Sequence, residues 1–202
     1  MLISFLRFCC GAVSVNGKVY IIGGYYDGYR SLSSGEMFDP VTNKWTPIPD
    51  MKEARSACAA CAIGNKIYAI GGCNGNKWVS SIEVFDTETK KWSSISNMTT
   101  ERHGCVAVSV KDNIYVFGGY YDSTNSFSSA EVYDTTTQKW TQLPEMKEKR
   151  SVCAATVVGN TIYIVGGNDC SNHRSSCEVF DTSTNTWSSF IPDMKSSSIN
   201  RY

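Results

Sequence analysis

Side chains able to carry out catalysis or bind a metal ion are few in this chain and lie far apart. Only two histidines occur, His103 and His173, and they fall in different parts of the 202-residue sequence. No serine, histidine and aspartate form a nucleophile motif, and no glycine-rich phosphate loop precedes a helix. We therefore expect no catalytic residue, no metal site and no cofactor.

Two groups of cysteines have spacings that a metal site could use. Cys58 and Cys61 form a C-x-x-C pair, but residues three apart on a strand point to opposite faces, and no second pair completes a zinc site. Cys170, His173 and Cys177 lie in one loop, but a fourth ligand is missing. We interpret the first pair as structural residues and the second group as part of an exposed polar loop.

Four of the nine cysteines recur at equivalent positions, about 48 residues apart. Cysteines that repeat in register usually fill one small buried position in each copy, whereas disulfides join different positions. We expect these four to be reduced core residues, as in a cytoplasmic protein. They are Cys10, Cys58, Cys105 and Cys153.

The whole sequence repeats one pattern four times. Each copy carries, in order, an arginine, a tyrosine, two adjacent glycines, a glutamate, an aspartate and a tryptophan. A fixed period of this kind indicates one supersecondary unit that is copied. The arginines are Arg7, Arg55, Arg102 and Arg150; the glycine pairs are Gly23-Gly24, Gly71-Gly72, Gly118-Gly119 and Gly166-Gly167; and the tryptophans are Trp45, Trp92, Trp140 and Trp187.

The second copy predicts four short strands and no helix. Residues 56–63 are small and apolar, and residues 66–70, 81–86 and 91–95 alternate between apolar and polar types with turn residues between them. Such a sheet, apolar on both faces, must be stacked between neighbours, and radial stacking gives an all-β propeller. We expect the first strand at the crowded centre and the tryptophan of the fourth strand buried between blades at the outside.

The order Tyr-x-x-Gly-Gly, Glu-x-[Phe or Tyr]-Asp and Trp resembles the kelch repeat, over nearly the whole chain. With Met-x-x-x-Arg in the linkers, it is most similar to the propellers of BTB–kelch proteins. The resemblance implies one kelch propeller domain, residues 1–202, with four blades of four antiparallel strands at about 7–50, 55–97, 102–145 and 150–191. Propellers of this family usually have six blades. We therefore expect part of a longer ring, with closure at four blades as the alternative, and association through the open ends.

The loops between the second and third strands differ from copy to copy and share one face with the inter-blade linkers. Variable loops on a rigid scaffold commonly carry binding, and aromatic and arginine side chains anchor protein interfaces. The resemblance points to the same face, at the residue after each glycine pair and beside each linker arginine. The predicted partner-binding residues are Tyr25, Tyr26, Tyr29, Arg30, Ser56, Asn74, Lys77, Trp78, His103, Tyr120, Tyr121, Ser151, Asn168 and Arg174.

The repeated glycines, tryptophans and linker arginines are expected to be structural. Each arginine should hydrogen-bond to carbonyl groups or pair with a registered glutamate across blades, with direct ligand contact as the alternative. Glycine at the end of the second strand permits a sharp turn or a close backbone approach.

Composition removes several function classes. The net charge is zero and 19% of residues are charged, so the chain lacks the basic excess of a nonspecific nucleic-acid or membrane-surface binder. No stretch of about 18 apolar residues is present. The resemblance implies a protein-interaction module that recognises substrates for a cullin–RING ubiquitin ligase, through a BTB domain that this sequence lacks. An actin- or cytoskeleton-binding kelch protein is one alternative, and a kelch-fold enzyme of the oxidase or epimerase type is another.

Overall fold

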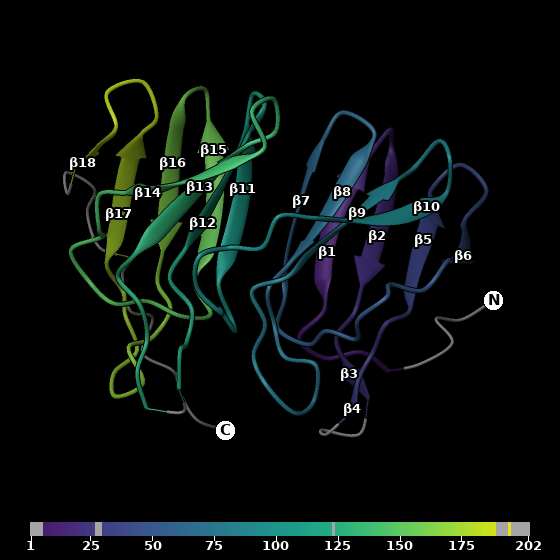
Figure 1. The fold of residues 1–202 in the computed structure, drawn as a ribbon, viewed down its shortest axis with the longest axis horizontal. Coiled ribbons are helices and arrows are strands. Elements are labelled where there is room, and N and C mark those ends of the chain that lie inside the picture. Colours follow the sequence, from purple (N-terminus) through teal and green to yellow (C-terminus); the bar gives the residue numbers. More distant parts are fainter. Residues whose placement is uncertain (1–5, 27–29, 123, 189–193, 195–202) are drawn as a thin grey trace.

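The computed structural model describes residues 6–26, 30–122, 124–188 and 194, and it is built from β-strands (Figure 1). No helix occurs in the described residues, so none is long and apolar enough there to cross a membrane. Sixteen of the strands form four antiparallel sheets of four strands each. The chain is an all-β propeller of four blades, as predicted.

Each blade is one consecutive antiparallel meander. Blade 1 contains β1 (Gly11–Val15), β2 (Lys18–Ile22), β5 (Gly35–Asp39) and β6 (Lys44–Ile48). Blade 2 contains β7 (Ala59–Ile63), β8 (Lys66–Ile70), β9 (Ile82–Asp86) and β10 (Lys91–Ile95). Blade 3 contains β11 (Val106–Val110), β12 (Asn113–Phe117), β13 (Ala130–Asp134) and β14 (Lys139–Leu143). Blade 4 contains β15 (Ala154–Val158), β16 (Thr161–Val165), β17 (Cys177–Asp181) and β18 (Thr186–Ser188). A small hairpin of β3 (Tyr25–Tyr26) and β4 (Arg30–Ser31) extends from blade 1.

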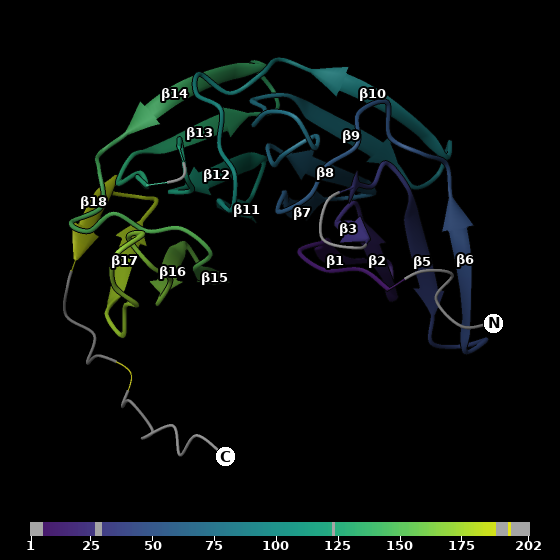
Figure 2. The same cartoon turned by 90° about the horizontal axis from the view of Figure 1, so that it is seen from below.

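The four blades stand side by side along an arc (Figure 2). The first strands β1, β7, β11 and β15 are innermost, and each contacts the next. Their small residues, such as the Ala-Ala-Cys-Ala run of β7, allow this close approach. The two end blades do not meet in Figure 2, so the four blades do not close into a ring of their own.

The core lies between neighbouring blades and repeats the same packing three times. Between blades 1 and 2, Tyr20 and Ile22 of β2 pack against Ile67 of β8 and Phe85 of β9, and all four are at most 2% exposed. Equivalent clusters join blades 2 and 3 and blades 3 and 4. Each sheet therefore depends on its neighbour, because an apolar face is stable only when another sheet covers it.

The tryptophans are half-buried at the outer rim, and Trp92, Trp140 and Trp187 pack against the clusters between blades. Each of three indole Nε1–H groups donates to a backbone carbonyl at the end of the preceding blade: Trp92 to Pro49 at 2.7 Å, Trp140 to Ser96 at 3.1 Å, and Trp187 to Pro144 at 2.8 Å. The polar edge of each of these rings needs an acceptor, and a carbonyl group of the preceding blade provides it. The tryptophans tie each outer strand to the blade before it.

The first strand of blade 2 is shorter than predicted, since β7 begins at Ala59 rather than Ser56. Ser56 instead forms an isolated bridge with Cys73, and Ala57 has a φ of 47°, which breaks the strand conformation. The linker thus turns just before it enters the blade.

Candidate interaction surface

The linker arginines form a buried layer beneath the loop face. Arg102 is fully buried and donates from Nη1 to the carbonyl oxygens of Gly118 at 2.8 Å and Ser129 at 3.1 Å. Its Nε donates to Glu131 Oε1 at 3.0 Å. Arg150 likewise donates from Nε to Glu178, whereas Arg7 and Arg55 donate from Nη2 to Glu36 and Glu83.

These ion pairs lie within one blade, which corrects the expectation that they bridge blades. Each linker passes under the blade that it enters, so its arginine reaches the glutamate of that same blade. The linker joins neighbouring blades through its backbone, because Gly119 N of blade 3 donates to the carbonyl oxygen of Arg150, in the linker to blade 4, at 2.8 Å. With their guanidinium groups buried and bonded, the arginines hold the scaffold.

The glycine pairs bring the loops against the linkers. Gly118 has a φ of 60°, and a Cβ atom placed on it would lie 2.1 Å from the carbonyl oxygen of Arg150. A Cβ atom on Gly119 would lie 3.0 Å from the carbonyl oxygen of His103, in the linker of its own blade. Only glycine permits two linkers to pass this close on either side.

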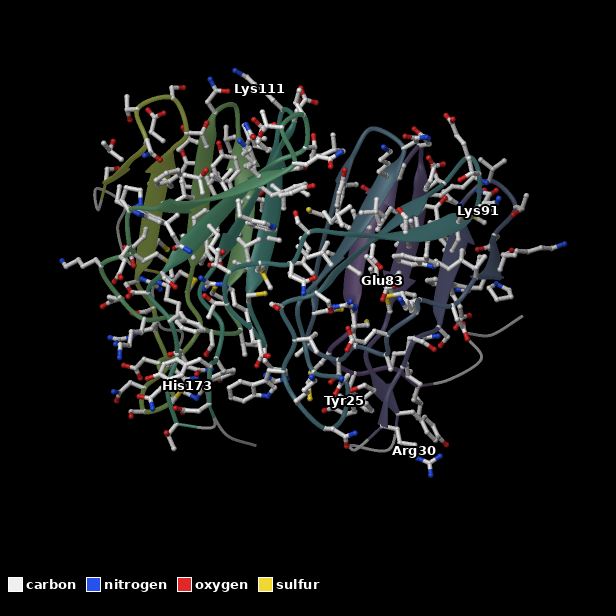
Figure 3. The ribbon with its side chains drawn as sticks, viewed as in Figure 1. Tyr25, Arg30, Glu83, Lys91, Lys111 and His173 are labelled. Carbon is white, nitrogen blue, oxygen red and sulfur yellow. The ribbon has the colours of Figure 1, made fainter. Side chains whose placement is uncertain are left out.

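As a result, the residue that follows each glycine pair forms a β-bridge with the residue that follows a linker arginine. Tyr120 N donates to His103 O at 2.7 Å, and His103 N donates to Tyr120 O at 3.3 Å. The four bridges of this kind are Phe8 with Tyr25, Ser56 with Cys73, His103 with Tyr120, and Ser151 with Asn168. Figure 3 shows Tyr25, Arg30 and His173 toward the same end of the molecule, away from Lys111.

A pocket of about 430 Å³ opens on this face between blades 2, 3 and 4. It brings together four predicted residues from three different repeats, and five more that the prediction did not include as partner contacts. The lining residues are Trp78, His103, Tyr120 and Asn168, with Asp122, Cys170, Ser171, Asn172 and His173.

One wall of the pocket is a row of rings. The Trp78 indole stacks on the His103 imidazole, with centroids 5.7 Å apart and planes 11° apart. The Tyr120 ring lies next to the His103 ring, and their centroids are 6.0 Å apart. The Tyr120 hydroxyl donates to Asn168 Oδ1 at 2.8 Å, and this joins blade 3 to blade 4.

His103 and Asp122 are the described pocket residues whose pKa values are shifted. Burial lowers the pKa of the His103 imidazole from 6.5, because the charged form would lose hydration. The buried Nδ1 atom has no hydrogen-bond partner within the described chain. At neutral pH the pocket therefore contains a neutral imidazole.

A second cluster lies over blade 1. Tyr25 stacks on Phe8 with centroids 5.7 Å apart, and the β3–β4 hairpin presents the exposed side chains of Tyr26 and Arg30. Tyr29, also predicted to bind a partner, lies outside the described residues.

Two predicted contact residues are buried instead. Ser151 is 0% exposed, and its Oγ donates to Asn168 Oδ1 at 3.0 Å. Ser56 is 8% exposed and accepts a hydrogen bond from Ser31 Oγ at 3.0 Å. Their burial is at odds with direct partner contact, because both hydroxyl groups are used inside the protein to position loop residues.

The other predicted residues have varied surroundings. Tyr121 packs on Phe127, 4.8 Å between centroids, and Asn74 Nδ2 donates to Glu53 Oε1 at 3.0 Å. Arg174 pairs with Glu148 and Asp169. Lys77 is exposed at the rim, beside Trp78.

The cysteines are all free in the described chain. Burial raises the pKa of Cys58 to about 11 and that of Cys105 to about 12, so neither is a thiolate at neutral pH. Their equivalents Cys10 and Cys153 are only partly buried, because each lies in an end blade. No cluster of three or more His, Cys, Asp or Glu side chains suited to a metal ion occurs in the part of the chain that the structure describes.

Comparison with known proteins identifies similar sequences. A profile described as "KLHDC2/KLHL20/DRC7 Kelch-repeats domain" matches residues 10–201. An F-box/kelch-repeat protein of Arabidopsis thaliana is 41% identical over 66 residues, which are 33% of this chain and 18% of that protein. Spermatocyte protein spe-26 of Caenorhabditis elegans is 39% identical over 72 residues, 32% of this chain and 12% of the relative. Kelch-like protein 25 of Mus musculus is 41% identical over 66 residues, 33% of this chain and 11% of the relative. The matched part is less than a fifth of each relative's length.

Proposed function

This chain belongs to the kelch-repeat family, and from that premise we propose that it recognises protein substrates for a cullin–RING ubiquitin ligase. Its family and its kelch-like and F-box/kelch relatives support a protein–protein interaction module. The ligase role rests on the similarity to BTB–kelch propellers. The contact with the cullin would be made by a BTB domain, and the kelch-repeat domain would hold the substrate.

The observation that carries this proposal is the continuous surface of Trp78, His103, Tyr120 and Asn168. These residues come from three repeats, yet they line one pocket and are held there by stacking and by a 2.8 Å hydrogen bond. Aromatic side chains in a concave site bury a large area and lose little conformational entropy, which makes them efficient anchors for a partner segment.

The proposed mechanism involves no covalent chemistry in this domain. A segment of the substrate binds across the loop face, and the propeller keeps it close to the ligase, where the effective concentration of substrate lysines is high. The rigid arginine layer favours binding, because a preformed surface costs less ordering entropy than a mobile one.

Affinity capture with the intact chain and with variants of the loop face tests this proposal. Tyr25→Ala, Arg30→Ala and Tyr120→Ala should each lose captured partners, while Lys111→Ala, on the opposite end of the molecule, should retain them. Equal capture by all the variants would contradict a binding role for the loop face.

A second measurement separates the ligase role from binding alone. Ubiquitylation of a captured partner should decrease when the protein is depleted from cells, and wild-type protein should restore it whereas Tyr120→Ala should not. Partners that bind through Tyr120 but whose ubiquitylation does not change, or co-sedimentation with filamentous actin, would favour the cytoskeletal alternative. We propose a cytoplasmic location, which the nine free cysteines support, and fractionation of cells tests it.

A further inference from the structure

We propose that the pocket between blades 2, 3 and 4 binds an arginine side chain of the partner segment. This inference rests on the proposed loop-face function and specifies the chemistry that the pocket selects. It follows from the shape of the pocket, its charge and the capacity of Asp122 to accept a further hydrogen bond.

The shape of the pocket suits a flat group. Trp78, His103 and Tyr120 are half-buried, so part of each ring borders the open volume of about 430 Å³. A guanidinium group is planar and weakly hydrated, and it stacks on aromatic faces, whereas an ammonium group is a compact and strongly hydrated point charge. A wall of rings therefore favours arginine over lysine.

The charge of the pocket also favours a cation. Of the nine described lining residues, one is a carboxylate, Asp122, and none is lysine or arginine. Hydrogen bonds from Asn125 and Thr124 lower the pKa of the Asp122 carboxyl, so it is ionised at neutral pH. Asp122 Oδ2 accepts only one of these bonds, from Asn125 Nδ2 at 3.0 Å, and has capacity for a further donor.

The cations nearest to the pocket are balanced by carboxylates. Arg174 pairs with Glu148 at 3.2 Å and with Asp169, and Lys77 interacts electrostatically with Glu53. The field at the pocket is therefore set by Asp122, and an acidic partner segment would be repelled.

Of Asp122 and Asn168, Asp122 is the acceptor with spare capacity. Asn168 Oδ1 already accepts from the Tyr120 hydroxyl, from Ser151 Oγ and from Cys170 N. The Nδ1 atom of His103 is buried, so it presents almost no accessible surface to a ligand. A guanidinium group has five N–H donors and can donate to Asp122 while it stacks on the rings.

Short peptides of the form acetyl-Gly-Gly-X-Gly-Gly-amide, with X as Arg, Lys, citrulline, Glu or Phe, test the assignment. They would be titrated into the intact chain, with the indole resonance of Trp78 and the imidazole resonances of His103 followed by NMR. The arginine peptide should bind at least about fivefold more tightly than the lysine and citrulline peptides, because only arginine combines a plane with a charge.

A variant pair sharpens the test. Asp122→Asn should weaken binding of the arginine peptide by about tenfold, the loss expected for a charge-assisted hydrogen bond. Asp112→Asn makes the same change of net charge in the exposed β11–β12 turn and should leave binding unchanged. Thermal unfolding of both variants controls for folding.

The outcomes separate this inference from the function on which it rests. Tighter binding of the glutamate or phenylalanine peptide, or full arginine affinity in Asp122→Asn, would overturn the arginine assignment. If partners captured by the whole chain still depend on Tyr120, the loop-face function stands without it. If the partners bind Tyr120→Ala as well as wild type, the proposed function itself fails.

Discussion

Arg102 and His103 are neighbours in the chain and differ in almost every physical respect. Arg102 is fully buried and bonded to Glu131, whereas His103 is half-buried and lines the pocket. The position of Arg102 holds arginine in all four repeats, and the position of His103 holds Phe8, Ser56, His103 and Ser151. Repetition marks the layer that builds the propeller, and the position one residue later varies: His103 lines the pocket there, whereas Ser56 and Ser151 are buried.

The glycine pairs show the same contrast. Gly118 and Gly119 repeat in every copy because two linkers pass within contact distance of them. The next residue varies as Tyr25, Cys73, Tyr120 and Asn168, and it faces the variable residue of its own linker. The variable residues are thus positioned by scaffold residues that are adjacent to them in sequence.

The largest expected effect is the loss of one scaffold arginine. Arg102→Met leaves Glu131 buried without its guanidinium partner, and breaking a buried ion pair on one side costs about 4 kcal/mol of unfolding free energy. Arg30→Ala, at an exposed position in β4, should change stability by less than about 0.5 kcal/mol. Chemical denaturation measures both unfolding free energies. Similar losses in the two variants would contradict the distinction between the repeated arginine layer and the variable loop residues.

A pair of glycine substitutions isolates the close approach of the linkers. Gly118 and Gly159 have φ values of 60° and 61°, but a Cβ atom at Gly159 would meet nothing within 4 Å. Gly159→Ala should cost about 1 kcal/mol for its backbone conformation alone. Gly118→Ala adds the clash with Arg150 O and should cost about 3 kcal/mol. Equal losses of unfolding free energy in the two variants would show that the close contact with the linker does not contribute to stability.

A smaller effect is expected in the variable layer. Tyr120→Phe removes the hydrogen bond to Asn168 and should lower the free energy of unfolding by about 1 kcal/mol. It should also weaken partner capture, because the Tyr120 ring loses the hydrogen bond that holds it at the pocket wall. Tyr121→Phe, at a side chain that is 46% exposed, is the control and should leave both measurements near wild type. Wild-type capture by Tyr120→Phe would mean that the bond only stabilises the fold.

The smallest effect is the contribution of His103 to pH dependence. Since burial lowers its pKa in the folded state, the unfolded chain binds more protons as the pH falls below 6.5. The fold must therefore lose stability on acidification through this window and regain it as the pH rises. Denaturation series from pH 7.5 to pH 5 should show a shallower dependence in His103→Gln than in wild type, and His173→Gln serves as the matched control. If the unfolding free energy of His103→Gln depends on pH as steeply as that of wild type, His103 is excluded as the source of the pH dependence.

Much of the blade architecture was predictable because its pattern is local. The alternating segments 66–70 and 91–95 coincide with β8 and β10, since period-two alternation and flanking turns define such strands. The start of β7 was wrong by three residues, because the bridge between Ser56 and Cys73 is a contact distant in sequence.

The pocket was predictable only in part. Residues next to the repeated arginines and glycines could be assigned to one face, and Trp78, His103, Tyr120 and Asn168 do lie together. Asp122 and Cys170 could not be found in this way, since their places are set by hydrogen bonds inside the variable loops, from Asn125 to Asp122 and from Cys170 N to Asn168. Nor could the burial of Ser151, which depends on Asn168 in another strand connection.

The end blades lack a neighbour on one side. Val158 of β15 is 64% exposed, while its counterpart Val110 of β11 is 6% exposed, and Met194 is 45% exposed against 3% for Met146. Nearest-neighbour cooperativity then implies a gradient of amide protection, highest in the two middle sheets and lowest at the margins. Local unfolding should begin at β15 and β16 and proceed toward the middle sheets, whose amides should exchange last.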